Sequence, residues 1–132
     1  MTALEDLVTE LTTTGLETLD AEKLKELKAR CKADSSGNTI TAVFHHVFKA
    51  LSKPHAQIRL SSLQVINELF ARSHAFRNLL VGHKLPDFLS LVFGAYGHSL
   101  PLPKLYSTKL QQLAARCFYE WVERYGFAYQ RL

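Results

Sequence analysis

Residues 58–70 read IRLSSLQVINELF, and this stretch decides the fold class. Apolar residues recur along it at helical spacing and cover almost the whole circumference of the expected helix. The polar positions form one narrow strip, made of Gln57, Ser61, Gln64, Glu68 and Arg72. A helix of this kind packs against neighbours on two sides. We therefore expect a central helix, whose core positions include Ile58, Leu63, Ile66, Leu69 and Phe70.

The residues before this stretch also have helical spacing. Leu4–Leu11 predicts a short first helix, and Asp20 is typical of a residue that caps a second one. In that second helix Leu24, Leu27 and Cys31 form a narrow apolar stripe, so we place Cys31 in the core.

A third helix is expected over residues 40–51, capped by Asn38 or Thr39. His46 lies opposite its apolar surface and is expected to be exposed. Pro54 is expected to open the central helix, because a proline at the first helical position lacks an N–H that would be unpaired there anyway.

The second half of the chain has the same character. A short helix over Ala75–Val81 is expected to end at Gly82, and another to run from Leu85 to Gly94. Residues 95–103 read AYGHSLPLP and predict a loop. A long helix over Lys104–Tyr125 follows, with a further short helix expected over residues 127–132. The sequence thus predicts an all-α fold, a right-handed superhelix of seven to eight helices.

Composition narrows the class of protein. The chain has 132 residues, 16 Lys and Arg against 12 Asp and Glu, 47% hydrophobic residues and two cysteines. These values predict a single domain over residues 1–132, with both thiols reduced. An acidic N-terminus without a basic segment is unlike a signal peptide, and the apolar runs are too short to span a membrane. We expect a soluble intracellular domain without a membrane partner.

The motifs of common enzymes are missing from the sequence. It contains no GxSxG, HExxH or glycine-rich phosphate loop, and its histidines lack the spacing of zinc ligands. Glu120 and Glu123 share a helix face, with Arg116 and Arg124 beside them, and are interpreted as solvated ion pairs. We therefore expect neither catalysis nor a cofactor nor a metal.

Charge is distributed unevenly along the chain. Residues 1–37 hold eight acidic and five basic residues, whereas residues 38–132 hold four acidic and eleven basic residues. Such asymmetry is compatible with docking to an acidic partner or to a nucleic-acid backbone. The basic residues stand singly, and the aromatic residues coincide with expected core positions, so we do not expect sequence-specific nucleic-acid binding.

A resemblance to known domains adds to these inferences. Residues 55–77, HAQIRLSSLQVINELFARSHAFR, resemble the fourth and fifth helices of VHS/ENTH-type domains. More narrowly, they are similar to the N-terminal domains of the UV-stimulated scaffold protein A family. LVTELTT at 7–13, EKLKELK at 22–28, LPLP at 100–103, and Trp121 followed by YGFAY at 125–129 occur in the same order in that family.

The resemblance implies a non-enzymatic scaffold domain, the N-terminal part of a longer protein, in transcription-coupled nucleotide excision repair of UV-induced DNA damage. It implies a location in the nucleus, on chromatin, and a place in the complex with stalled RNA polymerase II. The implied direct partner is the Cockayne syndrome A ubiquitin-ligase subunit. TFIIH and a ubiquitin-specific protease would be bound through regions outside this chain.

Two candidate sites follow from the resemblance. VHS domains that bind ubiquitin carry Trp and then Leu one turn apart on the second helix, where this chain has Leu24 and Lys28. That exchange removes most of the apolar contact expected with ubiquitin. On the last helix, Trp121 is the single tryptophan of the chain. Leu110, Ala114 and Cys117 on its helical face favour burial, whereas Glu120 and Arg124 beside it favour exposure. Our hypothesis is that Trp121 docks the ligase subunit together with Glu120 and Arg124, with packing in the core as the alternative.

Two other functional classes stay open at this point. An endosomal VHS-type adaptor that binds ubiquitinated cargo or sorting peptides would share the fold and composition. Leu24, Lys28 and the run from Ile58 to Arg77 favour the repair scaffold. A basic helical domain that binds nucleic acid would instead lose affinity steeply as salt is added.

Overall fold

A computed structural model describes residues 3–94, 100–129 and 131–132 of the chain. Every regular element within these ranges is helical, so the fold is all-α, as the hydrophobic spacing predicted. The elements in chain order are α1 (Leu4–Thr12), α2 (Ala21–Ala33), α3 (Asn38–Leu51), α4 (Ala56–Arg72), α5 (His74–Leu79), the π-helical turn η1 (Leu80–Lys84), α6 (Leu85–Phe93) and α7 (Lys104–Tyr125).

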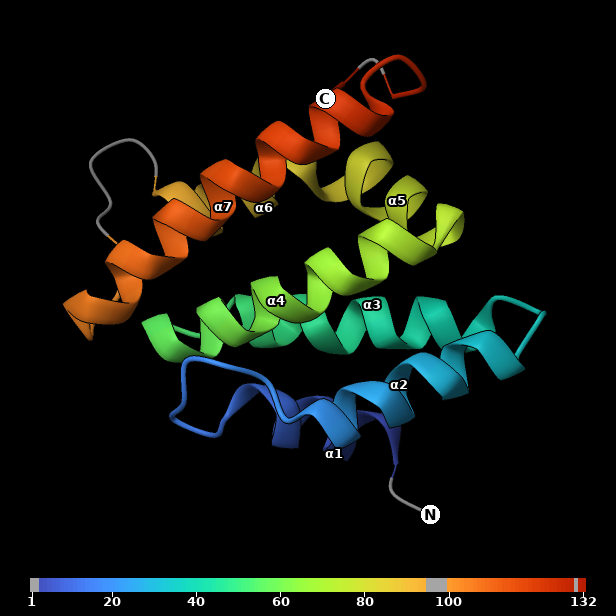
Figure 1. The fold of residues 1–132 in the computed structure, drawn as a ribbon, viewed down its shortest axis with the longest axis horizontal. Helices are drawn as coiled ribbons and strands as arrows, with labels where there is room; N and C mark the ends of the chain where they lie inside the picture. The colour runs from blue at the N-terminus through green and yellow to red at the C-terminus, as the bar shows by residue number, and fades with distance from the viewer. Residues whose placement is uncertain (1–2, 95–99, 130) are drawn as a thin grey trace.

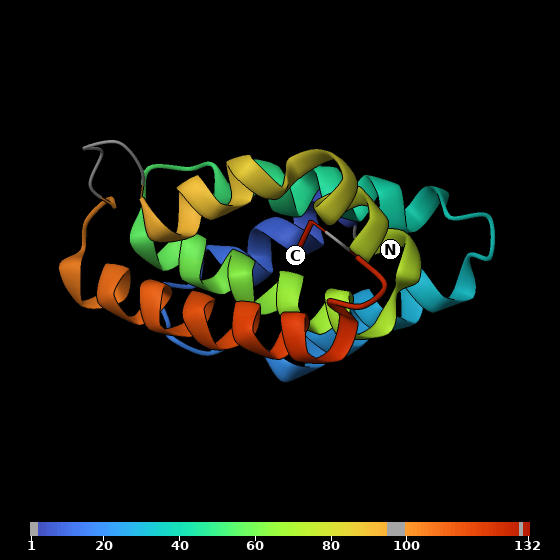
Figure 2. The same ribbon diagram turned by 90° about the horizontal axis from the view of Figure 1, so that it is seen from above.

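The helices form three layers (Figure 1). α1 and α2 make one outer layer, α3 and α4 lie in the middle, and α6 and α7 make the other outer layer (Figures 1 and 2). α4 contacts α1, α3 and α7, which makes it the central helix. None of the helices in the described ranges has the length and apolar character needed to cross a bilayer.

The core runs through this middle layer. Leu63, Ile66, Leu69 and Phe70 of α4 are all buried. Ile58 is only partly buried, because it lies near the start of the helix and borders a hollow between α1 and α3. Cys31 is likewise partly buried, at the edge of the core.

The polar strip of α4 is not simply a solvated surface. Gln57 is 2% exposed, and its Nε2 donates to Ser61 Oγ at 2.8 Å and to the Leu16 carbonyl at 3.3 Å. Gln64 Nε2 donates to the Glu17 carbonyl at 2.7 Å. The strip therefore holds the connection between α1 and α2 against the central helix.

The helix caps agree with the sequence at α2 and differ at α3. The Asp20 carboxylate accepts hydrogen bonds from the backbone N–H groups of residues 22 and 23, as predicted. At α3 the expected caps, Asn38 and Thr39, are wrong. The residue before α3 is Gly37, at φ 85°, and the Asp34 carboxylate accepts from the Thr39 N–H at 3.0 Å. A backbone at positive φ favours glycine, which has no Cβ to clash.

Two further helix boundaries differ from the prediction. Pro54 lies outside α4, and His55 precedes the helix, with its Nδ1 accepting from the Gln57 N–H at 3.2 Å. Gly82 does not end a helix, because the chain continues through η1 into α6. The backbone at Gly82 does not have a positive φ, whereas Gly94, the residue after α6, has a φ of 80° that favours glycine.

The long last helix has the predicted bounds. α7 runs from Lys104 to Tyr125, and its Leu110, Ala114, Cys117 and Trp121 are buried. The expected helix over residues 127–132 is wrong in the part that the structure describes, where turns follow Gly126. Residues 95–99 of the predicted loop lie outside the described residues.

Candidate interaction surface

Trp121 belongs to the core. Its side chain is 3% exposed, and its ring stacks on Phe70 at a centroid distance of 4.1 Å. The indole Nε1 donates a hydrogen bond of 2.9 Å to Asn67 Oδ1 on α4. The direct contact expected between Trp121 and a partner is therefore not available in this structure. The ring instead fixes α7 to the central helix.

The neighbours of Trp121 form an exposed surface. Glu120 and Arg124 point to solvent, and so do Tyr119 and Val122, which are 66% and 40% exposed. Phe127, just beyond the helix, is 90% exposed. These side chains are spread over the exposed half of the end of α7 and the turn that follows it. We call Tyr119, Glu120, Val122, Arg124 and Phe127 the α7 outer face.

The α7 outer face combines the features of a protein contact surface. Exposed aromatic rings and arginine are enriched at interfaces, and tyrosine and arginine are frequent among the residues that carry most of the binding energy. Sequence reasoning missed Phe127, beyond the helix, and two residues on the helix, Tyr119 and Val122. The two on the helix lie off the buried stripe that includes Leu110 and Trp121, so the helical spacing that marked the core also marked them as exposed.

The candidate ubiquitin face, Leu24 and Lys28, is occupied by contacts within the domain. Leu24 is partly buried and packs against the core. Lys28 Nζ lies 3.0 Å from Glu68 Oε2 on α4, and Arg72 Nε lies 3.8 Å from the same oxygen. The two positions therefore link α2 to α4 in this structure.

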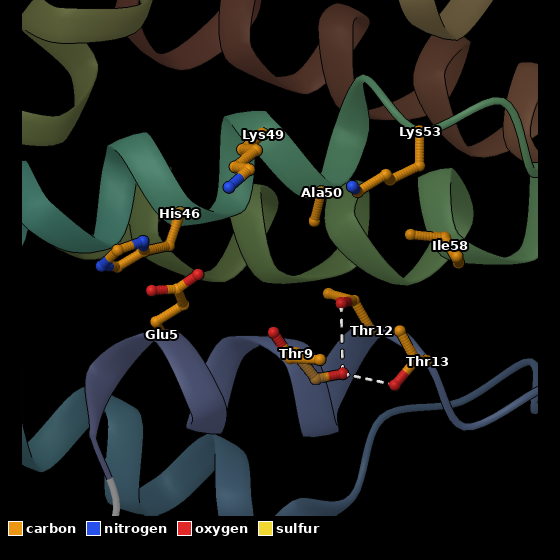
Figure 3. A pocket seen from close by; sticks show the side chains of 9 residues that line it. All are labelled: Glu5, Thr9, Thr12, Thr13, His46, Lys49, Ala50, Lys53 and Ile58. Atoms are coloured by element: carbon orange, nitrogen blue, oxygen red, sulfur yellow. Dashed lines mark hydrogen bonds between the residues drawn. The ribbon is translucent and has the colours of Figure 1, made fainter.

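A hollow of about 200 Å³ lies between α1 and α3 (Figure 3). His46 and Lys49 of α3 border it, with Lys53 just after that helix, opposite Glu5 of α1. The expectation that His46 is exposed is only partly met, because α1 covers one side of its ring. The hydroxyls of Thr12 and Thr13, at the α1 side, donate to carbonyls of their own helix, Val8 O and Thr9 O.

The cysteines do not have the properties of reactive thiols. Burial raises the pKa of Cys117 to about 12, and burial also raises the pKa of Cys31. A nucleophilic cysteine requires the opposite shift, since the thiolate is the reactive form. Across the described ranges, no three His, Cys, Asp or Glu side chains are grouped so that they could hold a metal ion.

These observations define a class of protein: an all-helical domain with exposed aromatic and charged side chains at the end of its last helix. The family model described as UVSSA N-terminal domain matches residues 1–132. The chain belongs to the UVSSA N-terminal domain family, which confirms the resemblance found in the sequence.

Curated relatives support the same assignment. The chain is 43% identical to UV-stimulated scaffold protein A of Bos taurus and 44% identical to that of Xenopus tropicalis, each over 130 residues. It is 28% identical over 127 residues to a UV-stimulated scaffold protein A homolog of Arabidopsis thaliana. These alignments cover 96–98% of this chain. They span 17–19% of the relatives, so the chain corresponds to about a fifth of their length.

Proposed function

We propose that this domain is a non-enzymatic scaffold module of transcription-coupled nucleotide excision repair, and that it docks the Cockayne syndrome A ubiquitin-ligase subunit through the α7 outer face. The observation that carries the proposal is the exposed group of Tyr119, Val122 and Phe127 beside Glu120 and Arg124. It occurs in a chain whose relatives are named UV-stimulated scaffold protein A.

Different residues have different parts in this docking. Tyr119 and Phe127 supply the apolar contact area, and Glu120 and Arg124 form a charged rim that orients the partner. Trp121 acts as a positioning residue, because its stacking on Phe70 and its hydrogen bond to Asn67 hold α7 in place. A preformed helix face loses little conformational entropy on binding.

The wider role is part of the same proposal. We also infer that the helices follow the right-handed superhelix of VHS/ENTH-type domains. The domain acts in the nucleus, on chromatin, as part of the complex assembled at stalled RNA polymerase II. Contacts with TFIIH and a ubiquitin-specific protease belong to other regions of such a scaffold.

The test is a binding measurement between this 132-residue chain and purified Cockayne syndrome A protein. Tyr119→Ala is expected to weaken binding about tenfold or more, the range of an aromatic hot spot. Leu105→Ala is the matched control, because Leu105 is 64% exposed on the same helix but lies four turns away. Equal affinity of Tyr119→Ala and wild type, with equal melting temperatures, would overturn the docking site.

Mono-ubiquitin provides the second arm of the experiment. The endosomal-adaptor alternative requires ubiquitin to be retained and the ligase subunit to be lost. With Lys28 paired to Glu68 and Leu24 packed against the core, we expect the ligase subunit alone to be retained. Retention of ubiquitin alone would overturn the repair-scaffold function and favour the sorting-adaptor function instead.

A further inference from the structure

A groove of about 730 Å³ lies where α2 ends, beside the start of α3 and the junction of α4 with α5. It is separate from the α7 outer face, and α7 contributes none of its lining residues. Its floor is apolar and is formed by Cys31, Ile40 and Leu69, while Ala71 and Ala75 leave room along one wall. The floor has space for an apolar side chain of moderate size.

The rim of the groove is basic. Lys28 and Lys32 border it from α2, and Arg72 borders it from α4. Lys32 and Arg72 are exposed, so both cationic groups are accessible to a ligand. An anionic partner is therefore favoured over a neutral or cationic one.

Asp34, the acidic residue among the described lining residues, is already engaged. Its Oδ1 accepts from the Ser36 hydroxyl at 2.6 Å and from the Ser36 N–H at 3.0 Å. Its Oδ2 accepts from the Thr39 hydroxyl at 2.7 Å and from the Thr39 N–H at 3.0 Å. These bonds hold the start of α3 and keep the Asp34 carboxylate ionised. Asp34 and Glu68 together offset two of the three positive charges of Lys28, Lys32 and Arg72, so the rim keeps a net positive charge.

Glu68 is paired with two of the basic side chains of the rim, and a ligand can displace it. Its Oε2 lies 3.0 Å from Lys28 Nζ and 3.8 Å from Arg72 Nε, and its side chain is 38% exposed. Ion pairs with this much exposure are weak. A carboxylate of an incoming ligand can therefore take the place of Glu68 at either cation without a large loss.

We propose that this groove binds an acidic peptide segment of a partner protein, with one apolar side chain on the floor and flanking carboxylates at Lys28, Lys32 and Arg72. The inference goes beyond the proposed function, because it concerns a second surface made by other helices. It does not depend on docking through the α7 outer face.

The experiment is a ¹H–¹⁵N NMR titration of this 132-residue chain with a blocked pentapeptide that has leucine between two pairs of glutamates. The backbone amide signals of Ala71, Ala75 and Ile40 are expected to shift together and to saturate. Two control peptides replace the leucine by glycine or the glutamates by lysines. The glycine peptide is expected to bind about fivefold more weakly, which corresponds to the loss of one weak contact. The lysine peptide is expected to bind more weakly still, because its charges are repelled by the basic rim.

Variants of the chain locate the site. Lys32→Glu is expected to weaken the glutamate–leucine peptide about tenfold, because an attraction becomes a repulsion. Lys49→Glu is the matched control, since it changes the net charge equally but lies at the hollow between α1 and α3. Glu68→Gln is expected to tighten binding about two- to fivefold, because it releases Lys28 and Arg72.

Three results would overturn the proposal. If Lys32→Glu and Lys49→Glu weakened peptide binding equally, the effect would come from the net charge of the domain and not from this groove. Equal binding of the leucine and glycine peptides would remove the role of the apolar floor. Displacement of the peptide by a short DNA duplex at equal charge concentration would assign the basic rim to nucleic acid. Loss of ligase binding in the separate α7 experiment would leave this proposal unaffected.

Discussion

α4 and α2 lie in neighbouring layers, yet they are held in the fold by different means. α4 is buried along most of its 17 residues, from Ala56 to Phe70. In α2, with 13 residues, Leu27 is the buried residue. α2 is attached to the fold by buried Leu27 and partly buried Leu24, with a weak ion pair between Lys28 and Glu68, and its own start is held by the Asp20 cap.

This difference indicates that α4 contributes mainly to stability and α2 mainly to the recognition surface. Burial of apolar area is the dominant stabilising term, so the stability of the domain is concentrated along α4 and the helices packed on it. α2 contributes less to stability and keeps its polar and basic side chains on the surface. It is therefore free to provide one wall of the basic groove.

The largest difference between the two helices is expected when an apolar side chain on each is shortened to alanine. Phe70→Ala on α4 is expected to lower the free energy of unfolding by about 4 kcal/mol, because a fully buried ring leaves a cavity beside Trp121. Leu24→Ala on α2 is expected to lower it by only about 1 kcal/mol, since that side chain is partly buried. Urea denaturation measures both, and equal losses would contradict the contrast.

The polar contact between α4 and α7 has the next largest effect. Asn67→Ala leaves the buried Trp121 Nε1 without its acceptor, and is expected to lower the free energy of unfolding by about 2 kcal/mol. Asn67→Asp keeps an oxygen at this position and serves as the control, with a smaller expected loss. If urea denaturation gave the same stability for Asn67→Ala and wild type, the hydrogen bond would have no net value.

A cap substitution sharpens the description of α2. Asp20→Ala removes the acceptor for two backbone N–H groups and is expected to cost about 1 kcal/mol. For a domain of this size the melting temperature should fall by about 4 °C. Asp20→Ser retains a capping oxygen and should melt close to wild type in circular dichroism. A larger fall than that of Asn67→Ala would mean that α2 is more important to stability than its burial indicates.

The smallest effect concerns the loop between α2 and α3. Hydrogen bonds from Ser36 and Thr39 hold the pKa of the Asp34 carboxyl well below its usual range. A lowered folded-state pKa means that its stabilisation is complete above pH about 4 and is lost as the pH falls further. Asp34→Asn should therefore be less stable than wild type at pH 6, and the gap should narrow at pH 3. Urea midpoints at the two pH values provide the measurement, and a constant gap would contradict the assignment.

Local features of the sequence predicted the fold well. Helical spacing alone placed α7 from Lys104 to Tyr125, and the Asp20 cap was visible because a cap is made with residues two and three positions away. The boundaries that were missed depend on backbone geometry. Gly37 was missed because its positive φ is not marked by any side chain, and Gly82 because a π-helical turn continues where a glycine suggested a stop.

The candidate sites were harder to predict because they depend on residues far apart in the chain. Trp121 resembles an interface residue until its partner Asn67, 54 positions earlier, is seen to accept from its indole. In the sequence Gln57 looks like a solvated residue, but in the structure it is buried and donates a hydrogen bond to the carbonyl of Leu16, 41 positions away. The basic groove joins α2 to the α4–α5 junction, and no spacing within either segment indicates it.

The position of Trp121 late in the chain has a consequence for synthesis in the cell. A nascent chain emerges with its N-terminus first, so α1 and α3 are available to cover one side of α4 well before α7 exists. The side of α4 that carries Phe70 then stays in contact with water until residue 121 has left the ribosome. During that interval the growing polypeptide offers an apolar strip to chaperones, and the strip disappears when α7 docks.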